Sequence, residues 1–427
     1  MKRIFILILM ILFQEVSISQ IVNGRFSTSV YSFEKFDTIG ISSSYWRAFQ
    51  TFQLDVTKER YSLHSLIQGN ANFSGDVDEI SNIKFYNLYF KIKKIFNVAD
   101  FNLGRQYIFG GIANGLIDGA AIKLSLYDNK LILKSFGGAI VNKELKPEIT
   151  KSLRNNYLLG FHLIGSPVND LSLSVSYMNR HRERLQYNTI RPDTLGFVYN
   201  QLIGYPSSAE QFISGDVDYN FLNYGRLYAR YDYDINMVQT SRLQFGTKVL
   251  VTNQIALIGE YIRRTPRLYF NSIFYVFQSN NTEEVEGGIE FSYKPNMKFY
   301  AKFANVQYSG DKANRYTIGM STEYGSLFYA GSNGYAGELS SVSAQIFYPL
   351  LERRIIPTIS VSRSSYKLTK NSDRYESFTG VFGAAVNLIK NISFDAQIHW
   401  LNNKVYKDDL RFLFKASYFF SQKLNIL

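Results

Sequence analysis

The sequence of 427 residues predicts an all-β fold, a transmembrane antiparallel up-and-down β-barrel of about 18–22 strands. Three observations predict it. Apolar and polar residues alternate with a period of two along many segments, which is typical of a strand with one dry face. Short and long connections alternate between these segments. Aromatic residues make up 16% of the chain, with 32 Tyr and 34 Phe, as expected for two aromatic belts at the edges of a bilayer.

An N-terminal leader precedes the first predicted strand. Lys2 and Arg3 are followed by an apolar run at 4–13, which is too short to span a bilayer, and then by small residues at Ser17 and Ser19. We therefore expect residues 1–19 to be a secretory signal peptide, with an uncleaved anchor as the alternative. Residues 20–427 then form a single barrel domain, and the expected location is the outer membrane of a Gram-negative-type cell.

Composition narrows the function classes. The chain has no cysteine, which excludes a disulfide framework and a thiolate metal or redox site. Its net charge of +12 becomes +11 when the leader takes away Lys2, Arg3 and Glu15. The basic residues are scattered rather than gathered in a block, so a positive lumen or positive loops are favoured over nucleic-acid binding. The mean hydropathy of −0.13 argues against a helical membrane protein, whereas lumen residues of a barrel offset its lipid-facing ones.

The predicted strands are clearest in segments 171–182, 226–234, 393–400 and 411–420, where one face is apolar and the other carries charged and hydroxyl residues. The closing strand is expected at 412–420 with a short tail, or somewhat later. Tight links are predicted at 58–59, 128–129, 167–170, 222–223, 253, 295–296, 325 and 390–391. Longer polar links are predicted at 34–43, 74–82, 142–154, 183–210, 266–283 and 367–373. The short links would face the periplasm.

Two of the long links have candidate roles. The link 183–210, with Arg184, Arg191 and Asp193, is expected to fold inward as a constriction or else to be an ordinary surface loop. The mostly apolar stretch 268–277 is expected to form a binding surface or a plug.

One segment goes beyond the general strand pattern. Residues 102–106 read Asn-Leu-Gly-Arg-Gln, Gly110 and Gly111 follow, and residues 117–120 read Ile-Asp-Gly-Ala. This segment resembles a hairpin of the alginate-export type of porin-like outer-membrane barrels over roughly residues 100–140. The resemblance implies an 18-stranded passive channel and, for an anionic polysaccharide, an Arg-rich conduit. No dense ladder of Arg and Lys is visible in this sequence.

The motif residues Gly104, Arg105, Gln106, Asp118 and Gly119 are expected to be structural. Arg105 shares a strand face with Leu103 and Tyr107, and an Arg that faces lipid at mid-depth costs about 2–4 kcal/mol. Either a bulge at Gly104 changes the register, or this face is luminal. An ion pair between Arg105 and Asp118 would lock the hairpin.

The charged residues on the polar strand faces are the candidate pore lining, and their mixed signs with a positive excess predict weak anion preference. They are Arg180, Arg182, Arg226, Arg230, Asp232, Lys302, Asp395, Arg411 and Lys415. The four histidines, His64, His162, His181 and His399, have no metal-ligand spacing, and no Gly-x-Ser-x-Gly motif occurs. We expect no metal, no cofactor and no enzyme activity.

The predicted function is an outer-membrane pore for small solutes, anionic ones included, or for export of a polymer. The alternatives are a non-conducting barrel for surface-polysaccharide assembly, and a hydrolase whose Ser, His and acid meet between strands. The expected partners are outer-membrane lipid or lipopolysaccharide and the solute or polysaccharide, with no nucleic acid. Uptake through a separate plug domain is not expected, because the strand pattern begins near Asn23.

Overall fold

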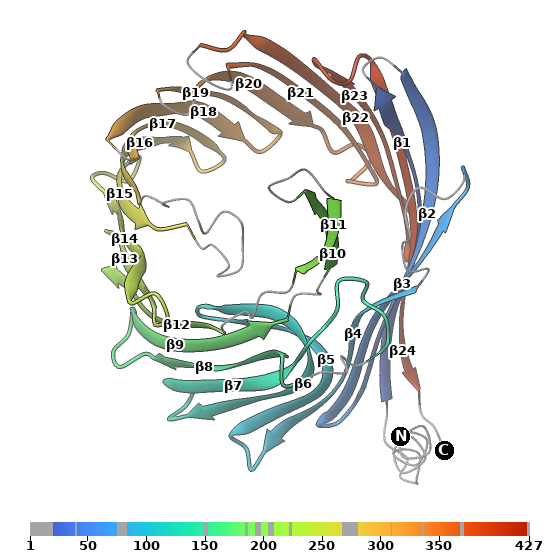
Figure 1. Ribbon diagram of the computed structural model, residues 1–427, viewed down its shortest axis with the longest axis vertical. Coiled ribbons are helices and arrows are strands. Elements are labelled where there is room, and N and C mark those ends of the chain that lie inside the picture. Colours follow the sequence, from blue (N-terminus) through green and yellow to red (C-terminus); the bar gives the residue numbers. More distant parts are fainter. Residues whose placement is uncertain are drawn as a thin grey trace.

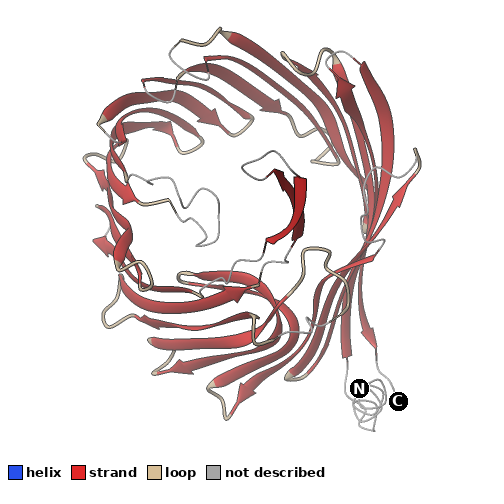
Figure 2. Cartoon of the chain, viewed as in Figure 1, coloured by secondary structure: helices blue, strands red, loops and turns tan. Residues whose placement is uncertain are grey.

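The computed structural model describes residues 20–38, 41–74, 83–148, 153–183, 187–192, 198–203, 209–221, 224–266, 281–308, 310–334, 337–367 and 371–424. The regular structure of these residues consists of strands (Figure 2). The strands are β1 (Gln20–Thr38), β2 (Ile41–Lys58), β3 (Tyr61–Asn72), β4 (Ile83–Ile95), β5 (Ala99–Gly110), β6 (Ala113–Leu126), β7 (Leu131–Ile140), β8 (Asn156–Gly165), β9 (Leu171–Arg182), β10 (Tyr187–Pro192), β11 (Val198–Ile203), β12 (Glu210–Phe221), β13 (Gly225–Asp234), β14 (Gln239–Leu250), β15 (Ile255–Arg264), β16 (Thr282–Lys294), β17 (Met297–Tyr308), β18 (Asp311–Thr322), β19 (Gly325–Gly334), β20 (Glu338–Phe347), β21 (Ile355–Lys367), β22 (Tyr375–Ile389), β23 (Ile392–Asn402) and β24 (Asp409–Leu424).

The wall is one closed antiparallel sheet of 22 strands (Figure 1). Each strand pairs with the next along the chain, β9 pairs with β12, and β24 pairs back onto β1. The predicted fold class is confirmed, with the strand number at the upper end of the predicted range. The 18 strands implied by the family resemblance are wrong for this chain.

The two faces of the wall differ in chemistry because side chains alternate along each strand. On β12 to β14, Val217, Leu227 and Phe245 are all more than 40% exposed on the outer face. Their strand neighbours Asp216, Arg226 and Gln244 point to the inner face. Such a continuous exposed apolar surface is unfavourable in water and matches the hydrocarbon core of a bilayer.

The connections follow the predicted rhythm. Links between β2 and β3, β6 and β7, β16 and β17, and β22 and β23 are tight turns, and the links between β3 and β4 and between β7 and β8 at the other end are longer. The link predicted at 34–43 is wrong, because β1 and β2 stay in register from Ile21↔Thr57 to Phe36↔Ser42. Polar residues there still satisfy their backbone groups by pairing across the hairpin.

The closing strand is longer than predicted: β24 runs over Asp409–Leu424 and pairs with β1 from Gln20 to Tyr31. Several predictions fall outside the described residues, namely the leader at 1–19, the link at 222–223 and the apolar stretch 268–277. In the described part of the chain, no helix has the length and apolar character needed to cross a membrane.

Candidate functional site

The inner face of the barrel carries the predicted charged residues. All nine candidates lie on strand positions whose neighbours in sequence point outward, for example Arg230 between Ala229 and Tyr231. Arg180 donates to Glu210 across β9 and β12 at 3.0 Å, Arg411 donates to Asp409 at 2.7 Å, and Asp395 lies opposite Lys415 on β23 and β24. Arg182 and Arg226 are exposed.

Asp232 departs from the prediction. This residue is 0% exposed in the barrel wall, so its carboxylate does not reach the lumen. It accepts hydrogen bonds from the Ser214 hydroxyl at 2.6 Å and from Arg230 Nε at 2.9 Å. Asp232 therefore positions the guanidinium of Arg230, which is the group that reaches the lumen.

Acidic partners of the cations were missed in the sequence. Lys302 lies 2.9 Å from Glu286, Arg315 lies 3.0 Å from the same carboxylate, and Lys248 lies 2.9 Å from Glu290. The register of β14 to β18 brings them together, and only the strand pairing reveals it. This sector of the lumen is therefore a network of paired charges rather than a purely basic surface.

A second sector bears hydroxyl groups instead of charges. Ser343 on β20, Ser362 on β21 and Thr379 on β22 lie side by side in the sheet, on the face opposite to the exposed Val342 and Phe382. Ser343 donates to Ser362 at 2.7 Å. The inner wall thus offers both ionic and neutral polar contacts.

The hairpin of β5 and β6 bends away from the wall into the barrel. Its tip lies against inner-face residues of other strands: the backbone N–H of Ile112 donates to the Ser176 hydroxyl on β9 at 2.9 Å. Ile117 of this hairpin is fully buried and belongs to one apolar cluster with Leu158 of β8 and Met178 of β9. Figure 1 shows β5 and β6 curving over the inner side of β8 and β9.

A line of three glycines allows this bend. Gly104 on β5 lies opposite Gly119 on β6, which lies opposite Gly138 on β7. Gly104 has a φ of 126°, and a Cβ at Gly119 would lie 2.2 Å from the Gly137 carbonyl oxygen. Side chains at these positions would collide with the backbone of the neighbouring strand, so the strands can approach this closely only with glycine.

Arg105 fills the opening that the bent hairpin leaves in the wall. The ladder between β4 and β5 ends at Leu88↔Arg105, and the β7–β8 loop enters there, where Phe85 N–H donates to the Leu145 carbonyl at 2.9 Å. Arg105 is 5% exposed and forms a bidentate ion pair with Asp118 at 2.8 and 2.7 Å. It also donates to the carbonyl oxygens of Phe85 at 3.2 Å and Lys146 at 2.6 Å.

The orientation of Arg105 differs from both sequence-based expectations, a bulge at Gly104 and a luminal strand face. Arg105 keeps the outward strand parity of Leu103 and Tyr107, but the β7–β8 loop covers it, so it faces neither lipid nor the lumen. Farther along the same face, Tyr107 and Phe109 are 58% and 79% exposed on the side of the hairpin turned away from β8 and β9. Gln106, on the other face, donates to the Gly119 carbonyl at 3.2 Å.

The link 183–210 contains a second hairpin. Strands β10 and β11 pair with each other from Tyr187↔Ile203 to Pro192↔Val198. In the view of Figure 1, this hairpin falls within the ring of wall strands. Arg191 belongs to β10, whereas Arg184 and Asp193 lie outside the described residues.

One histidine takes part in a Ser–His–Asp chain. Ser62 lies 3.0 Å from Nε2 of His64, and Nδ1 of His64 lies 2.5 Å from Asp55 across β2 and β3. This is the hydrogen-bond order of a serine hydrolase triad. Ser62 is only 2% exposed, however, so its hydroxyl is not open to a substrate. No group of His, Asp and Glu with metal-binding geometry occurs in the described ranges.

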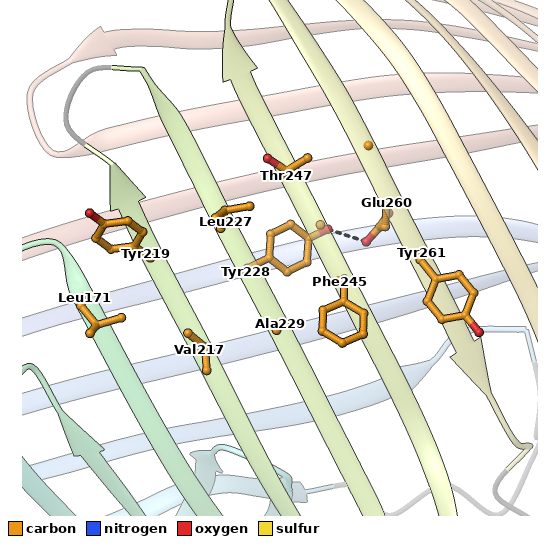
Figure 3. Close-up of a pocket in the computed structure, with 12 residues that line it drawn as sticks. Leu171, Val217, Tyr219, Leu227, Tyr228, Ala229, Phe245, Thr247, Glu260 and Tyr261 are labelled. Carbon is orange, nitrogen blue, oxygen red and sulfur yellow. Dashed lines mark hydrogen bonds between the residues drawn. The ribbon is translucent and has the colours of Figure 1, made fainter.

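The outer surface has an apolar groove of about 750 Å³ over β9 and β12 to β15. Figure 3 shows Val217, Leu227 and Phe245 along it, and also Tyr228 hydrogen-bonded to Glu260, whose strand positions belong to the inner face. Its apolar lining matches the acyl chains of lipid, and it lies on the face opposite to the charged lumen.

A closed barrel with an apolar exterior and a charged interior belongs to the class of integral membrane β-barrels. No protein-family model and no curated protein matches the chain. Among solved structures, the chain is similar to a BenF-like porin from Pseudomonas fluorescens Pf-5, with a TM-score of 0.46 at 8% identity over 94% of this chain and 99% of that one. It is also similar to OccK5 (OpdH) of Pseudomonas aeruginosa, with a TM-score of 0.44 at 11% identity over 94% and 98% of the two chains. The translocation pore of the P pilus usher PapC gives a TM-score of 0.45 at 9% identity over 93% and 99%.

Proposed function

We propose that this protein is an outer-membrane channel through which small solutes diffuse. The observation that carries the proposal is the wide closed wall with a charged inner face. A circular barrel of 22 strands, spaced about 4.8 Å apart and tilted by about 40°, would be about 44 Å across between opposite backbones. Side chains alone cannot fill such a width, so the lumen is wet wherever the inward hairpins leave it open.

The inward hairpin of β5 and β6 limits the size of the solutes that can pass through the channel. It is held by a buried apolar cluster and by Arg105, which makes it a fixed part of the channel rather than a hanging loop. A fixed obstacle reduces the opening without closing it, because the hairpin covers only the inner face of β8, β9 and the adjoining strands. This arrangement favours small solutes over a folded or bulky polymer.

The lining supports weak rather than strong ion selectivity. Lys302, Arg315 and Lys248 are each neutralised by glutamates, and the hydroxyl sector is uncharged. An export conduit for an anionic polysaccharide, which the alginate-export resemblance implies, would require a continuous series of unpaired cations. The paired charges of β14 to β18 argue against that finer assignment.

The proposal is tested by planar-bilayer recording of the purified barrel in a salt gradient. Steady current steps with a small reversal potential are the expected result. A folded, heat-modifiable barrel that passes no current would refute the channel and favour the non-conducting assembly barrel, in which the two inward hairpins seal the lumen.

The hydrolase alternative depends on Ser62, His64 and Asp55. Ser62 is 2% exposed, which keeps its hydroxyl from a substrate, and we expect a fluorophosphonate probe to leave the folded barrel unlabelled. Labelling that is lost in Ser62→Ala, but kept in Ser65→Ala on the same strand, would establish a hydrolase instead.

A further inference from the structure

Two lysines face each other on the inner wall, and neither forms an ion pair with a carboxylate in the described chain. Lys123 on β6 and Lys134 on β7 are directly opposite in the ladder. Their parity is inward, because Phe136 on the same face belongs to the apolar cluster under the hairpin, while Ile122 on the other face is 37% exposed to the outside. Opposite residues of an antiparallel pair have Cβ atoms about 4.5–5.5 Å apart, and like charges there are destabilising.

Neither lysine is neutralised within the described parts of the chain. No carboxylate lies within ion-pair distance of Lys123 or Lys134 there, in contrast to Lys248 and Lys302. The carboxylate in the neighbouring ladder position, Asp100, is opposite Lys123 but is engaged elsewhere. It lies 3.6 Å from Lys91 Nζ and accepts a hydrogen bond from the Lys94 N–H at 3.0 Å.

The tip of the β5–β6 hairpin lies close to this pair. His162 on β8 is the next residue in the row, opposite Lys134. The hairpin tip lies over His162, because a Cβ at Gly110 would be 3.5 Å from its Nδ1. The lysines therefore lie beside the base of the inward hairpin, on a wall bordered by its apolar cluster and open toward the lumen. Both are partly exposed, so a soluble ion can reach them.

We propose that Lys123 and Lys134 form a lumenal binding site for a small oxyanion, a phosphate or carboxylate group of a solute in transit. An anion between the two ammonium groups would accept a charge-assisted hydrogen bond from each, and would convert their repulsion into two attractions. The inference deepens the proposed function, since it rests on solutes reaching the lumen, and it assigns the channel a preference for anionic solutes at this one position.

The test uses the exported full chain, purified from membranes, with inorganic phosphate as the probe. Chloride current is recorded across a bilayer while phosphate is titrated at constant ionic strength. We expect saturable inhibition, and the half-inhibiting phosphate concentration to rise about tenfold or more in K123Q/K134Q. The matched control is K248Q/K302Q, which removes the same inner-face charge from lysines that already have glutamate partners. The half-inhibiting phosphate concentration of this control is expected to stay within about twofold of that of the parent.

Equal shifts in the two double variants would overturn the site, because they would show that only the average charge of the lumen matters. A current that phosphate does not inhibit in a saturable manner would overturn it too, while leaving the channel intact. If no variant conducts, the channel proposal fails, and the site is decided by the phosphate dependence of the thermal unfolding midpoint. A rise of that midpoint with phosphate in the parent but not in K123Q/K134Q supports the site, and its absence overturns it.

Lys134→Glu separates binding from a structural role. It places a carboxylate opposite Lys123, where an ion pair replaces the repulsion, so the barrel is expected to unfold at the same or a higher temperature while the phosphate response disappears. A loss of stability in this variant would mean that the two lysines hold the wall together, and would refute the proposal.

Discussion

Replacing Arg105 by Met tests whether the bent hairpin and the β7–β8 loop are held by one side chain. Arg105 and Asp118 are 5% and 12% exposed, and the change leaves the Asp118 carboxylate without its bidentate partner. Removing one member of a buried ion pair costs about 3–5 kcal/mol. In the same step the loop loses hydrogen bonds from Arg105 to three of its carbonyl oxygens, those of Leu145, Lys146 and Glu148.

The assay has a global and a local readout. Urea unfolding is followed by the fluorescence of Trp46 and Trp400, which lie on β2 and β23, away from the hairpin. Trypsin cleavage after Lys143 reports on the loop itself, since Lys146 is followed by Pro147 and is not cleaved. We expect Arg105→Met to release the loop so that trypsin cleaves after Lys143, and to lower the unfolding free energy if the loop and wall unfold together.

Two variants make the result interpretable. Arg363→Met breaks an ion pair with Glu376 whose side chains are 68% and 61% exposed, and it is expected to change stability by less than about 1 kcal/mol. The double variant Arg105→Met with Asp118→Leu removes both charges and should recover much of the loss. The reasoning is refuted if Arg105→Met resists trypsin and urea as the parent does, or if it behaves like Arg363→Met.

Further predictions concern the glycine line, the hairpin tip and the outer face. Gly119→Val should prevent the hairpin from packing, because its Cβ would lie 2.2 Å from the Gly137 carbonyl oxygen, and should lower the unfolding free energy by more than about 3 kcal/mol. Gly110→Ala makes only ordinary contacts and should leave the unfolding free energy unchanged in the same urea titration. A disulfide should form in Gly110→Cys/His162→Cys, since a Cβ at Gly110 would lie 3.6 Å from the His162 Cβ and the chain has no other cysteine. A shift in gel mobility on reduction measures the disulfide. A pair that stays reduced under oxidant would show that the hairpin tip does not lie against β8. Phe245→Arg on the outer face should destabilise the barrel in lipid by about 2–4 kcal/mol, and Ser343→Arg on the inner face should not; equal effects would contradict the assignment of the two faces.

The barrel wall could be predicted from the sequence because alternation with a period of two shows which residues lie on each face of a strand. Residues 226–234 alternate between lipid-facing and lumen-facing side chains in the sequence as they do in β13. Strand ends were harder, since nothing local distinguishes a membrane-spanning stretch from its extension, and β1 and β2 continue through residues that looked like a loop.

The inner-face contacts were harder to predict because they depend on the register between strands and on the inward bend of the β5–β6 hairpin. Strand alternation assigned cations to the polar strand faces but showed no partners for them, since Glu284, Glu286 and Arg315 meet only across three strands. The inward turn of the β5–β6 hairpin is a tertiary feature, although its glycines and Arg105 stood out in the sequence. The sequence did carry a signal for the lysine pair, because Lys123 and Lys134 lie equally far from the predicted turn at 128–129.

The junction between β1 and β24 has a consequence for how the barrel is made. Every other pair of wall strands is joined by neighbouring chain, but Ser27 and Ser417 meet at 2.9 Å across 390 residues of sequence. Contacts of such separation form late, because the intervening chain must be ordered first. Until they form, two strands present unpaired N–H and C=O groups, which a bilayer interior does not tolerate. Assembly of this wall is therefore close to all-or-none: an intermediate with β1 and β24 apart needs both edges shielded, by water or by another protein, until the last pairing is complete.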